Sequence, residues 1–277
     1  MTARQALREH WPEYLIEAWA LGTFMISAGL VATLLGFPGS PLRRLIPDPM
    51  LRNVLAGAAM GLTAIALIHS PWGKRSGAHM NPAVTLTFLR LGKIRGWDAV
   101  FFIAAQSVGG IFGVLVVAAV VGSAFTDAPV SYAATMPGPA GPWIAFIAEL
   151  AISGALMFVI LTLSGSARLA RFTGVAAGSL VALYISFESP LSGMSMNPAR
   201  TFASAAPGML WENLWVYLIA PVLGMLGGAQ LFLAMRGAQR LACAKLLHPA
   251  DVRCIHCGYQ PARFATGTGA VQRVAEN

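Results

Sequence analysis

Charged side chains are scarce in this chain. They make up 11% of the 277 residues, against roughly 25% in an ordinary soluble domain. Hydrophobic residues account for 56% of the sequence. Too little charge is available to cover a surface that faces water on all sides, so we exclude a pair of soluble domains and expect one domain embedded in a membrane.

Cysteine is also scarce. Cys243, Cys254 and Cys257 all lie near the C-terminal end, with His248 and His256 close by in the sequence. Cys254 and Cys257 form one pair, whereas a structural zinc site needs four ligands. We therefore expect reduced thiols on a mostly flexible tail and no metal site, with metal binding by Cys254 and Cys257 as the alternative.

Long apolar runs dominate the rest of the chain. Most of them reach the ~20 residues that a helix needs to cross a bilayer, and the fifth, which is shorter, can borrow neighbours at its ends. Glycines recur inside the runs, which lets membrane helices pack closely. The six runs cover about residues 14–37, 51–70, 99–122, 143–167, 172–187 and 214–235. They predict an all-α membrane protein with six transmembrane helices.

The first run follows Arg4 and Arg8, as the apolar part of a secretory signal would. It is about twice as long as the apolar region of a signal peptide, and it contains Glu17. We interpret it as the first span.

Basic residues in the connections predict the orientation. Six spans place both termini on one side, and the side richer in Lys and Arg is cytoplasmic. The terminal side receives fifteen of the 19 basic residues: Arg4, Arg8, Lys74, Arg75, Arg90, Lys93, Arg95, Arg168, Arg171, Arg236, Arg240, Lys245, Arg253, Arg263 and Arg273. The other side receives Arg43, Arg44 and Arg52, and Arg200 is not explained by this count. Cytoplasmic termini follow, and the net charge of +8 indicates topology rather than a nucleic-acid partner.

The two halves of the chain are similar in outline. Each has a glutamate in its first span (Glu17 and Glu149), an apolar second span, a Met-Asn-Pro-Ala tetrad and a Gly-rich third span. Three spans per half invert the second copy relative to the first, as in many transport proteins. We expect repeats at about 14–122 and 143–236 within one channel domain (14–236), between a cytoplasmic segment 1–13 and a cytoplasmic tail 237–277, whose Gly-Thr-Gly run at 267–269 is typical of disorder.

Each tetrad predicts the start of a half-helix. Proline is favoured in the first turn of a helix, and asparagine is a strong N-cap. The apolar stretches that follow, 84–91 and 201–209, are too short to cross a membrane. A helix can begin inside a membrane where its end faces protein or a water-filled cavity. The sequence thus predicts two re-entrant half-helices that enter from opposite faces.

Two such half-helices can meet with their N-termini at the midplane. Their positive dipole ends would then oppose cations and protons, while Asn81 and Asn197 could donate N–H groups to water or an alcohol. An Asn-Pro pair alone can also be a turn initiator. Two copies in register within an inverted repeat favour the half-helix interpretation.

The motifs Ser76-Gly-Ala-His-Met-Asn-Pro-Ala-Val-Thr85 and Asn197-Pro-Ala-Arg-Thr201 resemble those of the aquaporin, or major intrinsic protein, family. The resemblance extends from about Tyr14 to Met235. It implies the hourglass fold of that family, a homotetramer with one pore per subunit, and passive flow of solutes through Asn81-Pro82-Ala83 and Asn197-Pro198-Ala199.

The resemblance also implies a constriction on the outer side of the pore, to which Arg200 belongs. A lone charge near the midplane is costly unless it lines a wet cavity, and a structural pair with a buried carboxylate is the alternative. Spacing from Asn197 adds Met194 and Ile185. In the second span we choose Met60, with Gly61 as the alternative.

These residues would form an apolar collar opposite one arginine, so we do not expect strict water selectivity. Water-selective relatives commonly have an aromatic residue at the Met60 position and histidine at the Ile185 position. Glycerol facilitators usually have aspartate directly after the arginine, where this chain has Thr201, followed by Ala205 in the water-channel pattern. Water, glycerol, small alcohols, ammonia and hydrogen peroxide all remain candidate solutes.

Four further residues are expected to support the pore. The family uses carboxylates such as Glu17 and Glu149 to hold the half-helix loops, and a proton relay would instead imply active transport. We expect His79 to stabilise its loop or line the pore mouth, and Gln106 to bond between helices.

Several other function classes fit the sequence less well. A secondary transporter would usually have more spans and coupling carboxylates, and a poorly conducting structural membrane protein would have little reason to keep Asn81, Asn197 and Arg200 together. We predict no enzyme and no cofactor, because no nucleophile, base or metal cluster accompanies the tetrads. The expected partners are the lipid bilayer of the cell membrane and small neutral solutes.

Overall fold

The structure is a computed structural model that describes residues 1–237, 241 and 243–261. All regular structure in these residues is helical. The Gly-Thr-Gly run at 267–269 lies outside them.

Six helices are long and apolar enough to cross a membrane. They are α1 (Ala3–Gly36), α3 (Pro49–His69), α6 (Gly96–Val121), α8 (Pro142–Ser164), α9 (Thr173–Phe187) and α12 (Leu214–Arg236). The fifth run borrows neighbours as expected, because the 3-10 turn η2 (Ala170–Phe172) extends α9 to an 18-residue span. The predicted set of six spans is confirmed.

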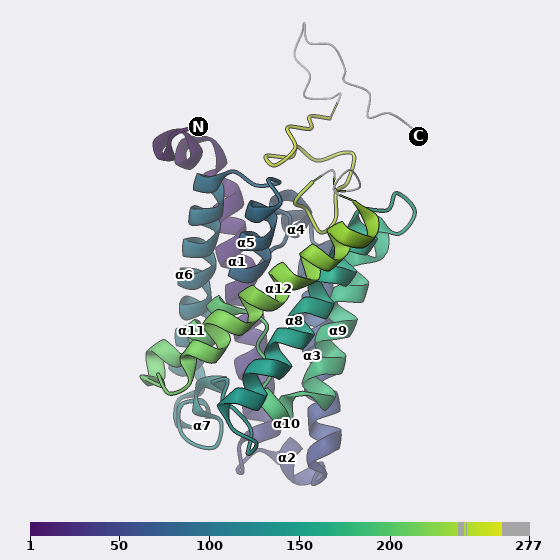
Figure 1. Cartoon of the computed structure of the whole chain (residues 1–277). Helices are drawn as coiled ribbons and strands as arrows, with labels where there is room; N and C mark the ends of the chain where they lie inside the picture. The colour runs from purple at the N-terminus through teal and green to yellow at the C-terminus, as the bar shows by residue number, and fades with distance from the viewer. Residues whose placement is uncertain (238–240, 242, 262–277) are drawn as a thin grey trace, which may run out of the picture.

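Both ends of the chain's helical bundle can be recognised in Figure 1. Helix α1 begins and α12 ends at the same end, which we call the terminal end. The short helices α2 (Pro41–Leu45), α7 (Ser123–Thr126) and α10 (Ser189–Ser192) lie at the opposite end. An even number of crossings accounts for this arrangement.

The two half-helices are α5 (Pro82–Arg90) and α11 (Pro198–Gly208). Helix α5 lies in the terminal half of the bundle and α11 in the opposite half (Figure 1). Each follows a short helix and a loop, with α4 (Pro71–Ser76) before the first and α10 before the second. The predicted fold, six spans and two re-entrant half-helices in an inverted repeat, is confirmed.

Glycine allows the spanning helices to approach closely. In repeat one α1 packs on α6, and in repeat two α8 packs on α12 in the corresponding way. A Cβ on Gly109 would lie 2.0 Å from the Ala18 carbonyl oxygen, and one on Gly224 would lie 2.2 Å from that of Leu150. No larger side chain fits at either crossing, so these contacts fix the helix pairs that surround the half-helices.

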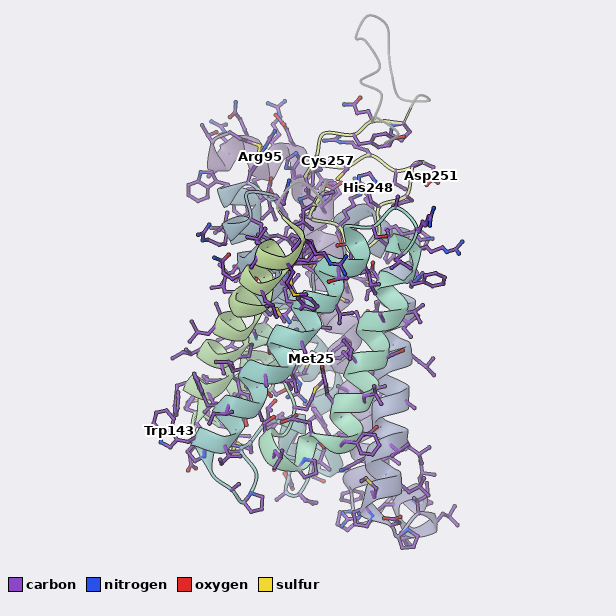
Figure 2. The ribbon with its side chains drawn as sticks, turned by 45° about the vertical axis from the view of Figure 1, so that its right-hand side comes forward. Met25, Arg95, Trp143, His248, Asp251 and Cys257 are labelled. Atoms are coloured by element: carbon purple, nitrogen blue, oxygen red, sulfur yellow. The ribbon has the colours of Figure 1, made fainter. Side chains whose placement is uncertain are left out.

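The outer surface of the bundle is apolar. Trp143 on α8 is 68% exposed, and Val108 and Phe112 on α6 are exposed to a similar degree. Figure 2 shows Trp143 on the outside of the bundle and Met25 within it. A surface of this kind suits lipid rather than water.

Candidate solute pathway

The two tetrads begin the half-helices as their residue types require. Asn81 caps α5, its side-chain oxygen accepting from the Ala83 amide at 2.8 Å. Asn197 caps α11, accepting from the Arg200 amide at 3.2 Å. Pro82 and Pro198 occupy the first turns, where a missing N–H leaves nothing unpaired.

The two asparagines also bind each other's loops. The Asn81 side-chain nitrogen donates to the Met196 carbonyl oxygen at 2.7 Å, and the Asn197 nitrogen donates to that of Met80, also at 2.7 Å. An amide nitrogen carries two hydrogens, so each asparagine keeps a second donor. The N-termini of the half-helices therefore meet, as the sequence predicts.

The loops before the half-helices have the same unusual backbone. Left-handed φ angles occur at Gly77, Ala78 and Met80 in the first loop, and at the corresponding Gly193, Met194 and Met196 in the second. A non-glycine residue in this conformation costs on the order of 1–3 kcal/mol. Something must hold these loops in place.

Buried glutamates hold both loops. Glu17 accepts from the Ser76 hydroxyl (2.7 Å), the His79 and Met80 amides (3.1 and 2.7 Å) and the Gln106 side chain (2.8 Å). Hydrogen bonds to a charged group contribute about 1.5–3 kcal/mol each, which is enough to offset the backbone strain.

Glu149 repeats this arrangement in the second half. It accepts from the Ser192 hydroxyl at 2.9 Å and from the amides of Ser195 and Met196 at 2.6 and 2.7 Å. Both glutamates are fully buried. The proposed support by Glu17 and Glu149 has a geometric basis in both repeats.

His79 and Gln106 both lie near the first loop. His79 bonds to the Thr85 hydroxyl at 3.0 Å and lines the cavity described next. Gln106 on α6 reaches both Glu17 on α1 and Thr85 on α5, so it bonds between helices.

One cavity of about 510 Å³ connects these features. Leu246 and Ile68 line it toward the terminal end, Arg43 and Arg52 toward the opposite end, and both asparagines between them. Its wall also includes Met60, Ile185, Met194 and Arg200. The structure thus brings all the predicted constriction residues to one lumen.

Packing separates the two candidates in the second span. Met60 lines the cavity. Gly61 faces α9 instead, where an added Cβ would lie 2.6 Å from the Gly178 carbonyl oxygen. Met60 is therefore the residue of this pair that faces the lumen.

Arg200 is held by the connection between the two repeats. Its guanidinium donates to the Thr135 hydroxyl, and Thr135 also contacts the Thr201 hydroxyl at 3.3 Å. In the described part of the chain, neither of the two ion pairs involves Arg200.

The geometry matches a known family. Residues 8–232 fit the family model described as MIP: Major intrinsic protein. The chain belongs to the major intrinsic protein family. The resemblance noted in the sequence is thereby confirmed.

Several named relatives of this major intrinsic protein are plant proteins. "Aquaporin NIP2-3" of Zea mays is 36% identical over 68% of this chain, which spans 60% of the maize protein's length. "Aquaporin NIP2-1" of Oryza sativa is 32% identical over 84% of this chain and 74% of its own length. The aquaglyceroporin structure from Plasmodium falciparum has a TM-score of 0.64 at 21% identity, covering 81% of this chain and 96% of its own, and shows a shared fold.

Sequence reasoning missed several residues of this family member's pathway. Ser76 and Ser192 bind the glutamates. A comparison of the two halves over a longer stretch than the tetrad would have identified them, because both loops begin with Ser-Gly and the serine lies five residues before the asparagine. Thr135 carried no such signal, since the connection around it has no counterpart in the other repeat.

The tail differs from the mostly flexible segment that its sequence indicates. Leu241, Ala244 and Cys254 are all less than 4% exposed in the structure. The segment 243–257 packs against the terminal end of the bundle. Its hydrogen bonds with the first loop satisfy backbone groups of the tail and of the loop. Its metal-ligating residues also lie closer together than one Cys pair would suggest, as described below.

Proposed function

We propose that this protein is a passive channel for water and other small uncharged solutes that excludes ions and protons. One observation carries the proposal: Asn81, Asn197 and Arg200 line a single cavity whose lining also includes residues toward both ends of the bundle. Membership in the major intrinsic protein family supports a channel rather than an enzyme.

Hydrogen-bond donors along the cavity determine which solutes are favoured. A solute entering an apolar collar loses its water shell and needs replacement partners. The second N–H of each asparagine and the guanidinium of Arg200 offer donors to an oxygen atom. A cation meets two helix N-termini and one fixed positive charge, all of which oppose it. Neutral oxygen-bearing solutes are therefore favoured.

A second candidate is a facilitator of glycerol, ammonia or hydrogen peroxide with little water selectivity. It is favoured by the collar of Met60, Ile185 and Met194, which offers hydrocarbon where a water-selective pore would present polar atoms. An apolar collar offers a dehydrating water molecule few replacement hydrogen bonds, so it reduces the preference for water over these solutes.

Stopped-flow light scattering of vesicles that contain the full chain would test both candidates. Water, glycerol, ammonia and hydrogen peroxide are offered in turn, and empty vesicles give the background. Permeability to at least one of these solutes above background supports the channel. Background rates for the whole panel, from folded protein, would favour a poorly conducting structural membrane protein.

We further propose a homotetramer in the cell membrane with both termini cytoplasmic. The family resemblance supports the assembly, and the basic residues at the terminal end support the orientation. Cross-linking in native membranes would test the assembly. Labelling of a cysteine placed at exposed Arg44, compared with one at exposed Arg8, by a membrane-impermeant thiol reagent would test the orientation.

A further inference from the structure

Four metal-ligating side chains of the tail lie together at the terminal end of the bundle. The ligand atoms of Cys243, His248, Cys254 and Cys257 all lie within 4.8 Å of one another. The Cys243 and Cys254 sulfurs lie 3.3 Å apart, and the His248 Nε2 lies 3.2 Å from the Cys257 sulfur. Figure 2 shows His248 and Cys257 side by side above the bundle.

The backbone between these residues favours the cluster. Cys254 and Cys257 lie on a tight turn, in which the Gly258 amide donates to the Cys254 carbonyl and the Cys254 amide donates to that of Tyr259. Gly258 has a φ of +75°, which side-chain-bearing residues rarely adopt. The Tyr259 ring lies against the His248 ring, with centroids 5.6 Å apart, and so fixes the position of this imidazole.

We propose that these four residues bind one zinc ion. Three thiols and one imidazole form a Cys3His set, which is a known four-coordinate donor set for structural zinc. Ligand atoms on a tetrahedron of bond length about 2.0–2.3 Å lie roughly 3.3–3.8 Å apart. The pairs at 3.3 and 3.2 Å are close to the lower end of this range, and the whole set lies within 4.8 Å. Soft thiolates select zinc over magnesium or calcium. The sequence shows a single Cys pair, and the fold supplies the two missing ligands.

The zinc site is connected to the first loop of the pathway. The Leu246 amide donates to the Gly77 carbonyl at 3.2 Å, and the Lys245 ammonium donates to that of Lys74 at 2.9 Å. His256, between two of the zinc ligands, bonds to the Ser76 carbonyl at 2.9 Å and stacks on His79 with ring centroids 5.7 Å apart. Both residues between Cys243 and Leu246 are almost completely buried.

Leu246 lines the cavity at this mouth. It lies between the ligands Cys243 and His248, so the ion fixes the segment that carries it. The zinc-bound tail is therefore a cap that narrows the mouth of the pathway at the terminal end. This consequence rests on the proposed channel function, whereas the zinc site itself does not.

Metal analysis of the purified full chain tests the site. The protein is made with a histidine-free affinity tag in zinc-supplemented medium, and zinc is measured per chain by mass spectrometry. We expect one zinc ion per chain, loss of it in the double variant Cys254→Ser/Cys257→Ser, and retention in His256→Ala, which changes the same turn but no ligand. Cobalt in place of zinc should give the intense visible bands of a tetrahedral thiolate site.

Two results would overturn the site. One is absence of zinc and of cobalt bands from folded wild-type protein. The other is zinc that remains in full in the double cysteine variant, because the ion would then lie elsewhere.

Water permeability tests the cap. Removing zinc with a chelator, or changing Leu246→Gly, should raise the stopped-flow rate by at least about threefold by widening the mouth. His256→Ala should raise it while zinc stays bound. Unchanged rates in a permeable wild type would overturn the cap, whereas a wild type at background, with zinc bound, would overturn the proposed function and leave the site intact.

Discussion

The first loop, Ser76–Met80, and the second loop, Ser192–Met196, have the same backbone and different surroundings. Both begin with Ser-Gly, turn left-handed at corresponding residues, donate to a buried glutamate and accept from the asparagine of the other half. These shared features position the two half-helix N-termini.

The differences lie inside the loops, where Ala78 and His79 correspond to Met194 and Ser195, and directly after the shared tetrad. Val84 follows the first Asn-Pro-Ala, and Arg200 follows the second. The first loop is covered by the tail, whose Ala244 carbonyl bonds to the His79 ring at 2.8 Å. The second loop is covered by the connection between repeats, because a Cβ on Gly193 would lie 2.7 Å from the Met136 carbonyl oxygen and 3.1 Å from the Thr135 methyl carbon.

The shared and the unshared features of the two loops have different roles. The symmetric hydrogen bonds build the narrow centre, and the asymmetric residues give each mouth its own property. Arg200 and its collar would then determine which solutes pass. The tail would control permeation where it covers the first loop. Changes to the shared features should harm the fold, and changes to the unshared features should alter permeation.

The largest effect is expected from the shared glutamates. Glu17→Gln and Glu149→Gln each bring a side-chain N–H against buried donors, which should destabilise the protein by at least about 3 kcal/mol. The midpoint of thermal unfolding in detergent would measure this. The matched control, Glu9→Gln, changes an exposed residue and should leave the midpoint unchanged. An unaffected Glu149→Gln variant would contradict the shared role.

Arg200→Val gives the second Asn-Pro-Ala the same following residue as the first, which is Val84. It removes both side-chain bulk and the fixed charge from the outer constriction, so the ratio of glycerol to water permeability should rise about tenfold. Cation leak should rise little, because the helix N-termini remain. Vesicles with equal amounts of each variant give the ratio, and Arg44→Val, outside the cavity lining, serves as the control. A ratio equal to that of wild type would remove Arg200 from the constriction.

Ile185→His should act in the other direction. A ring with a polar nitrogen narrows the collar and offers a dehydrating water molecule a partner, so the same ratio should fall by about threefold. Ile185→Leu keeps the hydrocarbon and should change it little. Equal ratios for the histidine and leucine variants would show that Ile185 lies away from the narrowest point.

The smallest effect is expected from Thr135→Val, which removes one hydrogen bond that positions Arg200. A bond to a charged group contributes about 1.5–3 kcal/mol, but the variant keeps Arg200 in the lumen. The glycerol-to-water ratio should therefore rise by only about twofold, while Thr135→Ser should restore the wild-type value. A change in overall protein stability without any change in the ratio would assign Thr135 a structural role alone.

Much of the shared architecture could be predicted from the sequence, because hydropathy marks the six spans and Asn-Pro marks a helix start. Of the unshared features, the resemblance implied Arg200, Met194 and Ile185, but the others could not be predicted. Met60 and Gly61 are neighbours, and only the contact between Gly61 and α9 decides which faces the lumen. Thr135 lies in an irregular connection. Cys243 and His248 join Cys254 and Cys257 through a tail without periodicity, so their proximity depends on packing against the first loop.

The central claim is that the two half-helix N-termini enclose one lumen for neutral solutes and not for ions. A single stopped-flow experiment tests it on vesicles that contain the wild-type chain and a trapped pH-sensitive dye, mixed with a hyperosmotic solution of lower pH. We expect scattering to report water flux at least about tenfold above empty vesicles, while the dye reports no proton entry above background. Proton entry that rises together with water flux would contradict the account.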